Sequence, residues 1–333
     1  MTKLQLEKNI KDIQSIALVD DCQLVKKEDS LLLLDLNEKI IKGVKDSGYT
    51  KSIIVNKDKT YIALVSSLFC EEFHVYSYPD LKAVITLNKI DSKGYYYKDA
   101  AFSPDGKCLY VLADEKSDSS YHESILVRID LNYQKYTSYF RGEGMHFDSL
   151  YYSKTKQALL LLEKKGRVSF FNQGKIIDRI KTPPYDKLSV IDWGQVLLLS
   201  SFAGFVLCSL KGKVIRTCDF LLPKPLKNDE RVRTEFEMEN ELLQLRGMNR
   251  MSVKDNLGEH YKDMVFSSEV GALFYLSYNM NDKTYRLYHY SIKTFALKHV
   301  YKIKGEVYHI HLAFPYLYIK TTDGVLVYRI LHD

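Results

Sequence analysis

Apolar residues along this chain gather in short runs of about 5–8 positions, separated by turn-forming or charged residues. One stretch is typical: Asp99–Phe102 leads into the segment Ser103–Gly106, and further apolar runs follow at Lys107–Ala113 and Ser124–Leu131. Such runs are rich in Val, Ile, Leu, Tyr and Phe and too short for helices, which predicts β-strands. The segment Ser103-Pro-Asp-Gly106 is expected to form a tight hairpin turn, because proline fixes φ and glycine tolerates positive φ.

A second pattern is that the chain repeats itself. The sequence Tyr97-Lys-Asp-Ala-Ala-Phe-Ser103 recurs as Tyr261-Lys-Asp-Met-Val-Phe-Ser267. Looser copies begin at Tyr49, Phe147, Tyr185 and Tyr308, and a degenerate copy begins at Ile10. Neighbouring copies start about 38–50 residues from each other, with one exception. The gap between the copies at Tyr185 and Tyr261 is longer, and it becomes regular if residues 223–259 are an insertion. Units of about 42 residues suit four-stranded blades, so the pattern predicts one all-β domain over residues 1–333. We expect a seven-bladed β-propeller, with six or eight blades as alternatives.

The two ends of the chain are expected to share a blade. After Tyr308 there is room for three strands, at Ile310–Phe314, Tyr316–Thr321 and Gly324–Leu331. The alternating segment Lys3–Lys8 can supply the fourth strand and remove an exposed sheet edge.

One of the predicted hairpins carries a family resemblance. The segment Phe102-Ser-Pro-Asp-Gly-Lys-Cys-Leu-Tyr-Val111 resembles blades of WD40-like, YVTN-type and lactonase-like β-propellers. The resemblance covers about 45 residues and implies the fold. It assigns no functional residues, since propellers with unrelated activities share this hairpin.

Charge and composition narrow the function classes. The chain has 48 Lys and Arg against 42 Asp and Glu, a formal net charge of +6, with no basic run that would indicate nucleic-acid binding. Neither an export signal nor a membrane-spanning apolar segment is visible, which predicts a cytoplasmic protein that does not bind membranes. The five cysteines are scattered and are expected to be reduced, buried thiols.

Catalytic and metal-binding patterns are few. The sequence lacks nucleophile-elbow, P-loop, dinucleotide-binding, zincin and EF-hand motifs. His309 and His311 would share one face of a strand and could begin a metal site, but no third ligand follows at a predictable spacing. The alternative is that both are ordinary polar strand residues, and we predict no cofactor.

The starts of the repeated units hold the first candidate binding surface. If these starts lie in or beside the loops that enter the innermost strands, aromatic and cationic side chains recur on one face, as suits a protein partner or acidic ligand. The candidates are Tyr97, Lys98, Phe147, Tyr185, Lys187, Tyr261, Lys262, Tyr308 and His309. In the alternative interpretation the aromatics pack against the next blade. The neighbouring Asp99, Asp148, Asp186 and Asp263 would then bind backbone N–H groups.

The insertion at residues 223–259 is the second candidate. Its apolar positions fit either a helix or a strand and are Phe236, Met238, Leu242, Met248 and Met251. Long insertions often carry function, so we consider a partner-binding arm, with a solvated loop as the alternative.

Together these features favour a non-catalytic protein–protein interaction module, acting as a scaffold, an adaptor or a neutralising partner. The alternative is a propeller enzyme with a site in its central channel, such as a lactonase-like hydrolase or a glycan-acting protein. Sensing of a small-molecule ligand or of a nucleic acid is the remaining option. The identity of a protein partner is not encoded in these patterns.

Overall fold

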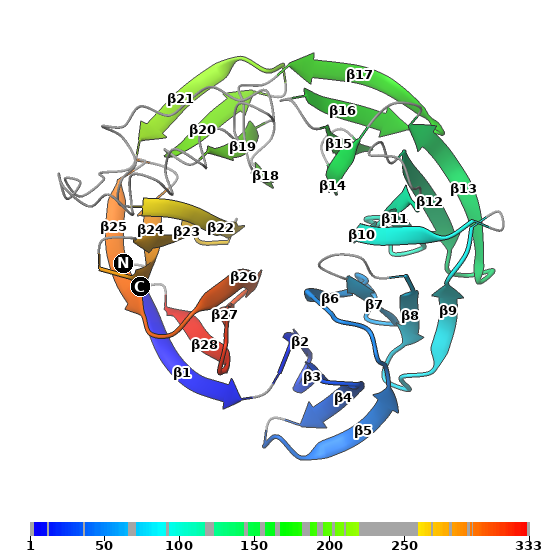
Figure 1. The fold of residues 1–333 in the computed structure, drawn as a ribbon, viewed down its shortest axis with the longest axis horizontal. Coiled ribbons are helices and arrows are strands. Elements are labelled where there is room, and N and C mark those ends of the chain that lie inside the picture. Colours follow the sequence, from blue (N-terminus) through cyan, green and yellow to red (C-terminus); the bar gives the residue numbers. More distant parts are fainter. Residues whose placement is uncertain are drawn as a thin grey trace. The chain divides into compact units, whose positions relative to one another are not determined.

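The structure of the chain is a computed structural model. It describes residues 3–331 except 12, 36, 66–70, 91–92, 117–122, 143–145, 154–156, 164–166, 182–186, 192–195, 202–203, 210, 220–258, 268, 280–281, 292–293 and 295. Every regular element in this described part is a β-strand, and the strands form four-stranded sheets, seven in all. Figure 1 labels the strands, which belong to two compact units.

The first unit comprises residues 10–164 and 168–179 and contains four sheets, except for Arg167 and residues 180–181 at the ends of two strands. Its sheets are β2 (Ser15–Val19), β3 (Cys22–Lys27), β4 (Ser30–Asp35), β5 (Ile40–Lys45); β6 (Ser52–Val55), β7 (Tyr61–Val65), β8 (Phe73–Ser77), β9 (Ala83–Leu87); β10 (Tyr95–Phe102), β11 (Cys108–Glu115), β12 (Ser124–Asp130), β13 (Lys135–Gly142); and β14 (Phe147–Ser153), β15 (Ala158–Glu163), β16 (Arg167–Asn172), β17 (Lys175–Lys181). Within each sheet the strands lie in chain order, and the first strand of one sheet packs beside the next sheet.

The second unit comprises residues 1–9, 165–167 and 180–333 and contains the other three sheets. These are β18 (Lys187–Ile191), β19 (Val196–Ser201), β20 (Gly204–Ser209), β21 (Val214–Asp219); β22 (Glu259–Ser267), β23 (Ala272–Asn279), β24 (Thr284–Ser291), β25 (Leu297–Ile303); and β26 (Val307–Ala313), β27 (Tyr316–Thr321), β28 (Gly324–Leu331), β1 (Lys3–Lys11). The last sheet joins the two ends of the chain, with β1 beside β28, which confirms the shared sheet predicted from the sequence (Figure 1).

Burial within the sheets explains why the apolar runs do not alternate with polar residues. Every residue of β15 is buried, as are seven of the eight residues of β23, because both faces of a middle strand are covered. By contrast β5 and β17, each the last strand of its sheet, are mostly exposed.

The predicted hairpin between β10 and β11 is present. Gly106 adopts a φ of 71°, and its N–H donates to the carbonyl of Ser103 at 2.9 Å. The Ser103 hydroxyl accepts from the Cys108 N–H at 2.9 Å, and Phe102 pairs with Leu109. The turn chemistry read from the sequence therefore sets the register of this hairpin.

The three cysteines whose side chains the structure describes, Cys22, Cys108 and Cys208, are free thiols. Cys108 and Cys208 are buried as predicted, whereas Cys22 is half-buried. Burial raises the pKa of the Cys208 thiol to about 11, so it stays protonated at neutral pH.

Candidate functional site

A β-bulge recurs near the start of the first strand in four sheets. The ladder skips one residue between Tyr97 and Asp99, between Phe147 and Ser149, between Tyr261 and Asp263, and between Val307 and His309. The extra residues are Lys98, Asp148, Lys262 and Tyr308. Because bulges redirect side chains, the residue before and the residue after each bulge have different surroundings.

The residue before the bulge points into the packing between sheets. Tyr97 and Phe147 are each 1% exposed and Val307 is 2% exposed. The ring of Tyr97 lies 5.8 Å from that of Phe73, and the ring of Phe147 lies 6.4 Å from that of Phe140. The prediction that Tyr97 and Phe147 line a binding surface is therefore wrong. Both lie within strands rather than in the entering loops, and the apolar packing between sheets buries their rings.

The residue after the bulge ties neighbouring sheets together. The Asp99 carboxylate accepts from the N–H of Ala100 at 2.9 Å and from Leu150 of the next sheet at 3.0 Å. The Asp263 carboxylate accepts from Met264 at 2.9 Å and from Ile310 of the next sheet at 2.9 Å. This confirms the alternative interpretation of the repeat for these two aspartates.

The other two repeat aspartates differ in position from Asp99 and Asp263. Asp148 is the extra residue of its bulge and is exposed, whereas Asp186 lies outside the described residues. In the final repeat the bulge aligns Val307, rather than Tyr308, with Tyr97. The alignment made from the sequence was therefore shifted by one residue there.

The extra residues of the bulges differ in how much surface they offer. The Lys98 ammonium contacts Asp114 Oδ2 at 2.7 Å and donates to the carbonyl of Phe147, so it bridges two sheets. Lys262 is exposed, with Nζ 5.9 Å from the centre of the Tyr278 ring, and Tyr308 is 49% exposed. Among the predicted residues whose side chains the structure describes, Lys262 and Tyr308 are thus the ones left open to a partner.

The remaining predicted residues fall into three groups. His309 and His311 are half-buried on β26, and the His311 ring stacks on that of Tyr318 at 6.2 Å. Lys187 and Tyr261 lie in β18 and β22. The residues outside the described part are Tyr185 and, in the insertion, Phe236, Met238, Leu242, Met248 and Met251.

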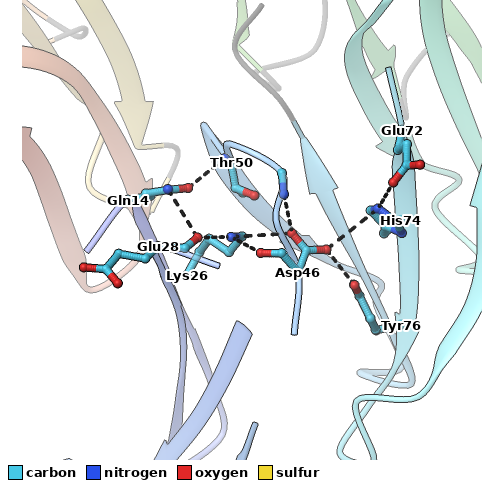
Figure 2. Close-up of polar contacts among 9 residues, drawn as sticks. Gln14, Lys26, Glu28, Asp46, Thr50, Glu72, His74 and Tyr76 are labelled. Carbon is cyan, nitrogen blue, oxygen red and sulfur yellow. Dashed lines mark hydrogen bonds and ion pairs between the residues drawn. The ribbon is translucent and has the colours of Figure 1, made fainter. Parts of the chain in front are cut away.

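A buried polar cluster, which we call the Lys26 cluster, lies between two sheets of the first unit. Figure 2 shows Lys26 of β3, Asp46 after β5, and His74 and Tyr76 of β8 converging there. The side chain of Lys26 is 0% exposed and that of Asp46 is 1% exposed. Sequence spacing could not reveal this cluster, because its members come from separate strands and Lys26 follows an ordinary apolar run.

The Lys26 ammonium contacts three oxygen atoms in this cluster. Nζ lies 2.7 Å from the carbonyl oxygen of Asp46 and 3.5 Å from Asp46 Oδ1, and it also donates to the carbonyl of Glu28. The Tyr76 hydroxyl donates to Asp46 Oδ2 at 2.6 Å, and burial followed by the nearby carboxylate raises the Tyr76 pKa far above its usual range. A buried charge pair with these partners holds the turn after β5 against β8.

The contacts of His74 extend this cluster toward solvent. His74 Nε2 lies 4.0 Å from Asp46 Oδ2 and 3.4 Å from Glu72 Oε2, and Nδ1 lies 3.2 Å from the Thr86 hydroxyl. The described residues contain no group of three or more His, Cys, Asp or Glu arranged to hold a metal ion.

An open pocket of about 660 Å³, which we call the lysine–tyrosine pocket, lies at one end of β23, β24 and β25. It is lined by Tyr278, Lys283, Thr284, Tyr285, Lys302, Ile303, Lys304, Gly305 and Glu306. The Tyr278 and Tyr285 rings lie 4.8 Å apart at a tilt of 46°. By the strand register this is the end at which β22 and β26 begin, so the pocket lies at the same end as the bulges carrying Lys262 and Tyr308.

Comparison with known proteins bears on the fold. No family model matches the sequence, and no curated protein matches it. A solved structure of the Myceliophteria thermophila Cps50 (Swd1) beta-propeller domain aligns over 99% of this chain and 100% of its own length, with a TM-score of 0.66 and 12% identity. The fold is that of a WD40-like β-propeller. Its four-stranded antiparallel sheets are the blades of this propeller.

A second solved structure is also similar over most of this chain. The structure of Saccharomyces cerevisiae Sqt1 aligns over 96% of this chain and 83% of its own, with a TM-score of 0.60 and 10% identity. At such identities the likeness establishes the propeller fold and transfers no residue roles. The part of the propeller that the structure describes holds no helix with the length and apolar character needed to cross a bilayer.

Proposed function

We propose that this propeller is a protein-interaction module, acting as a scaffold, an adaptor or a neutralising partner, and that its partner contacts the blade ends where the bulges lie. The observation that carries the proposal is the exposure of Lys262 and Tyr308, each the extra residue of a bulge on a strand otherwise fixed by its neighbours. Rigid elements that present exposed aromatic and cationic side chains suit protein recognition, because little conformational entropy is lost on binding.

The experiment is capture from the lysate of the protein's own host, followed by identification and reconstitution with the purified partner. The test variant is Lys262→Glu/Tyr308→Ala. The matched control is Lys135→Glu/Tyr133→Ala, which changes the same residue types at exposed positions around the β12–β13 turn, the opposite end of a blade from its bulge.

We expect one stoichiometric partner that binds the wild type and the control but is lost from the test variant. A partner retained equally by both variants would overturn the proposed surface. The absence of any stoichiometric protein would overturn the proposed function.

We further propose that residues 1–333 form one domain in which the seven sheets are the blades of a single ring. Support comes from the sheet that joins β1 to β28, because a strand exchanged between the ends of the chain favours closure. A single calorimetric unfolding transition for the full chain is the expected result, and two resolved transitions would contradict it.

We also propose that the insertion at residues 223–259 is a partner-binding arm. Residues 223–258 lie outside the described part of the chain, and Glu259 begins β22. Deleting residues 226–257 should weaken capture of the partner without lowering the melting temperature. Unchanged capture by the deletion variant would leave the arm without a role in binding.

A further inference from the structure

The lysine–tyrosine pocket is surrounded by positive charge that no ion pair described above involves. Lys283, Lys302 and Lys304 are exposed on its lining, and Lys262 stands beside it over the Tyr278 ring. None of these four lysines forms an ion pair with another described residue. The pocket therefore combines several cations that have no fixed counter-charge.

The carboxylates nearby do not cancel this charge. Glu306 is the one acidic residue of the described lining, and the exposed Asp323 lies beside Gly305, with Oδ2 3.8 Å from where a Cβ would stand on that glycine. Asp282, on the connection between β23 and β24, is engaged by Arg286 and by the Thr284 hydroxyl, and these contacts hold its pKa below the usual range against the opposing effect of burial. The local excess of positive charge attracts an anionic ligand.

The shape of the pocket suits an extended ligand rather than a small ion. Lys283 lies on the β23–β24 connection, whereas Lys302 and Lys304 lie at the end of β25 and on the connection to β26. Gly305, at a φ of 84°, lets the chain turn sharply between Lys304 and Glu306. The cations thus stand on separate connections around an open pocket instead of converging on one point.

The tyrosines provide the apolar part of the surface. The paired rings of Tyr278 and Tyr285 form one wall, and the Tyr285 ring is largely buried. Burial, followed by the nearby Glu306 carboxylate, raises the pKa of Tyr285, so its hydroxyl stays protonated at neutral pH. Such a wall can contact the aliphatic stems of side chains while the lysines hold their carboxylates.

We propose that the lysine–tyrosine pocket binds an extended acidic segment of a partner protein. This inference rests on the proposed function and specifies the chemistry of the partner. An acidic peptide fits better than a nucleic acid, because Tyr285 is only 9% exposed and offers little ring face for base stacking, and because the chain's net charge is only +6.

The test measures binding of a fluorescently labelled oligoglutamate peptide to the purified full chain. The pocket variant is Lys302→Glu/Lys304→Glu. The control, Lys298→Glu/Lys135→Glu, has the same change in net charge, with exposed lysines at the opposite ends of their blades from the bulges. Circular dichroism and melting curves verify that all three proteins are folded.

We expect the pocket variant to bind the peptide at least about tenfold more weakly than the wild type, and the control to change by less than about twofold. Equal loss in both variants, or no binding to the wild type, would overturn the inference. A labelled single-stranded oligonucleotide that binds the same pocket more tightly than oligoglutamate would overturn it in favour of a nucleic acid.

The two proposals can fail separately. If the captured partner is lost on Lys262→Glu/Tyr308→Ala but retained by Lys302→Glu/Lys304→Glu, the interaction module stands and the acidic-segment inference is wrong. If no partner is captured at all, the proposed function fails whatever the peptide does.

Discussion

The Lys26 cluster and the lysine–tyrosine pocket both combine lysine, tyrosine and a carboxylate, and they differ in the partners that these charges have. In the Lys26 cluster the ammonium and the Asp46 carboxylate are buried, and each group meets partners fixed by the backbone. In the pocket Lys302 and Lys304 are exposed, whereas Tyr278 and Tyr285 pack against each other. The comparison teaches that a buried charge with hydrogen-bond and ion-pair partners has a structural role. An exposed charge beside a rigid aromatic wall is instead available for recognition.

The largest effect should follow from breaking the buried pair. Replacing Lys26 by methionine leaves the Asp46 carboxylate without its cation, which should lower the free energy of unfolding by about 3–5 kcal/mol. The measurement is urea denaturation of the purified protein. The control, Lys302→Met, should change stability by less than about 0.5 kcal/mol. Equal losses in the two variants would contradict the contrast drawn between the two regions.

The next effect concerns pH and the buried imidazole of His289. Burial, followed by the charges of His299 and Lys298, lowers the pKa of His289 to about 4, below the value near 6.5 of the unfolded chain. Between these values the unfolded chain binds the extra proton, so stability should fall by about 2–3 kcal/mol as pH drops from 6.5 to 4.

The matching variant is His289→Phe, because the ring already stacks on Phe274 at 5.1 Å. It should flatten the pH dependence of the melting temperature over this window. A variant that keeps the full slope would show that other groups cause it.

A smaller effect should follow at the bulges. The Asp263 carboxylate joins β22 to β26 through the Ile310 N–H and is 4% exposed, so Asp263→Ala should cost about 2 kcal/mol. Hydrogen exchange should accelerate at Ile310. The exposed Asp148, the extra residue of its own bulge, is the comparison, and a loss as large for Asp148→Ala would argue against this role for Asp263.

The smallest effect on stability is expected at the pocket itself. Lys302→Glu/Lys304→Glu should shift the melting temperature by no more than about 2 °C while changing peptide binding, because both side chains are exposed. A pronounced loss of stability would mean that these lysines support the fold, and the contrast with Lys26 would disappear.

Much of the fold could be predicted because its signals are local. Short apolar runs and the Ser103–Gly106 turn encode strands and a hairpin within a few residues, and the repeated segments reveal the unit length. The shared sheet of the two ends could be predicted by counting strands, since β26, β27 and β28 leave one position for β1.

The candidate site was harder to predict because a shift of one residue along a strand decides which side chains are exposed. A bulge moves Val307 into the packing and Tyr308 to the surface, and no propensity of these residues reveals that shift. The Lys26 cluster depends on contacts between residues 20–30 positions apart, and the pocket depends on two connections brought together by β24 and β25.

The pairing of β1 with β28 also has a consequence for biosynthesis. Glu7 of β1 lies 3.7 Å from Arg329 of β28, across almost the whole length of the chain. During translation β1 leaves the ribosome long before β28 is synthesised. The backbone groups of β1 that pair with β28 therefore have no strand partner until β28 emerges. The sheet that holds both ends is therefore expected to form late, after the blades whose strands follow one another directly have already assembled.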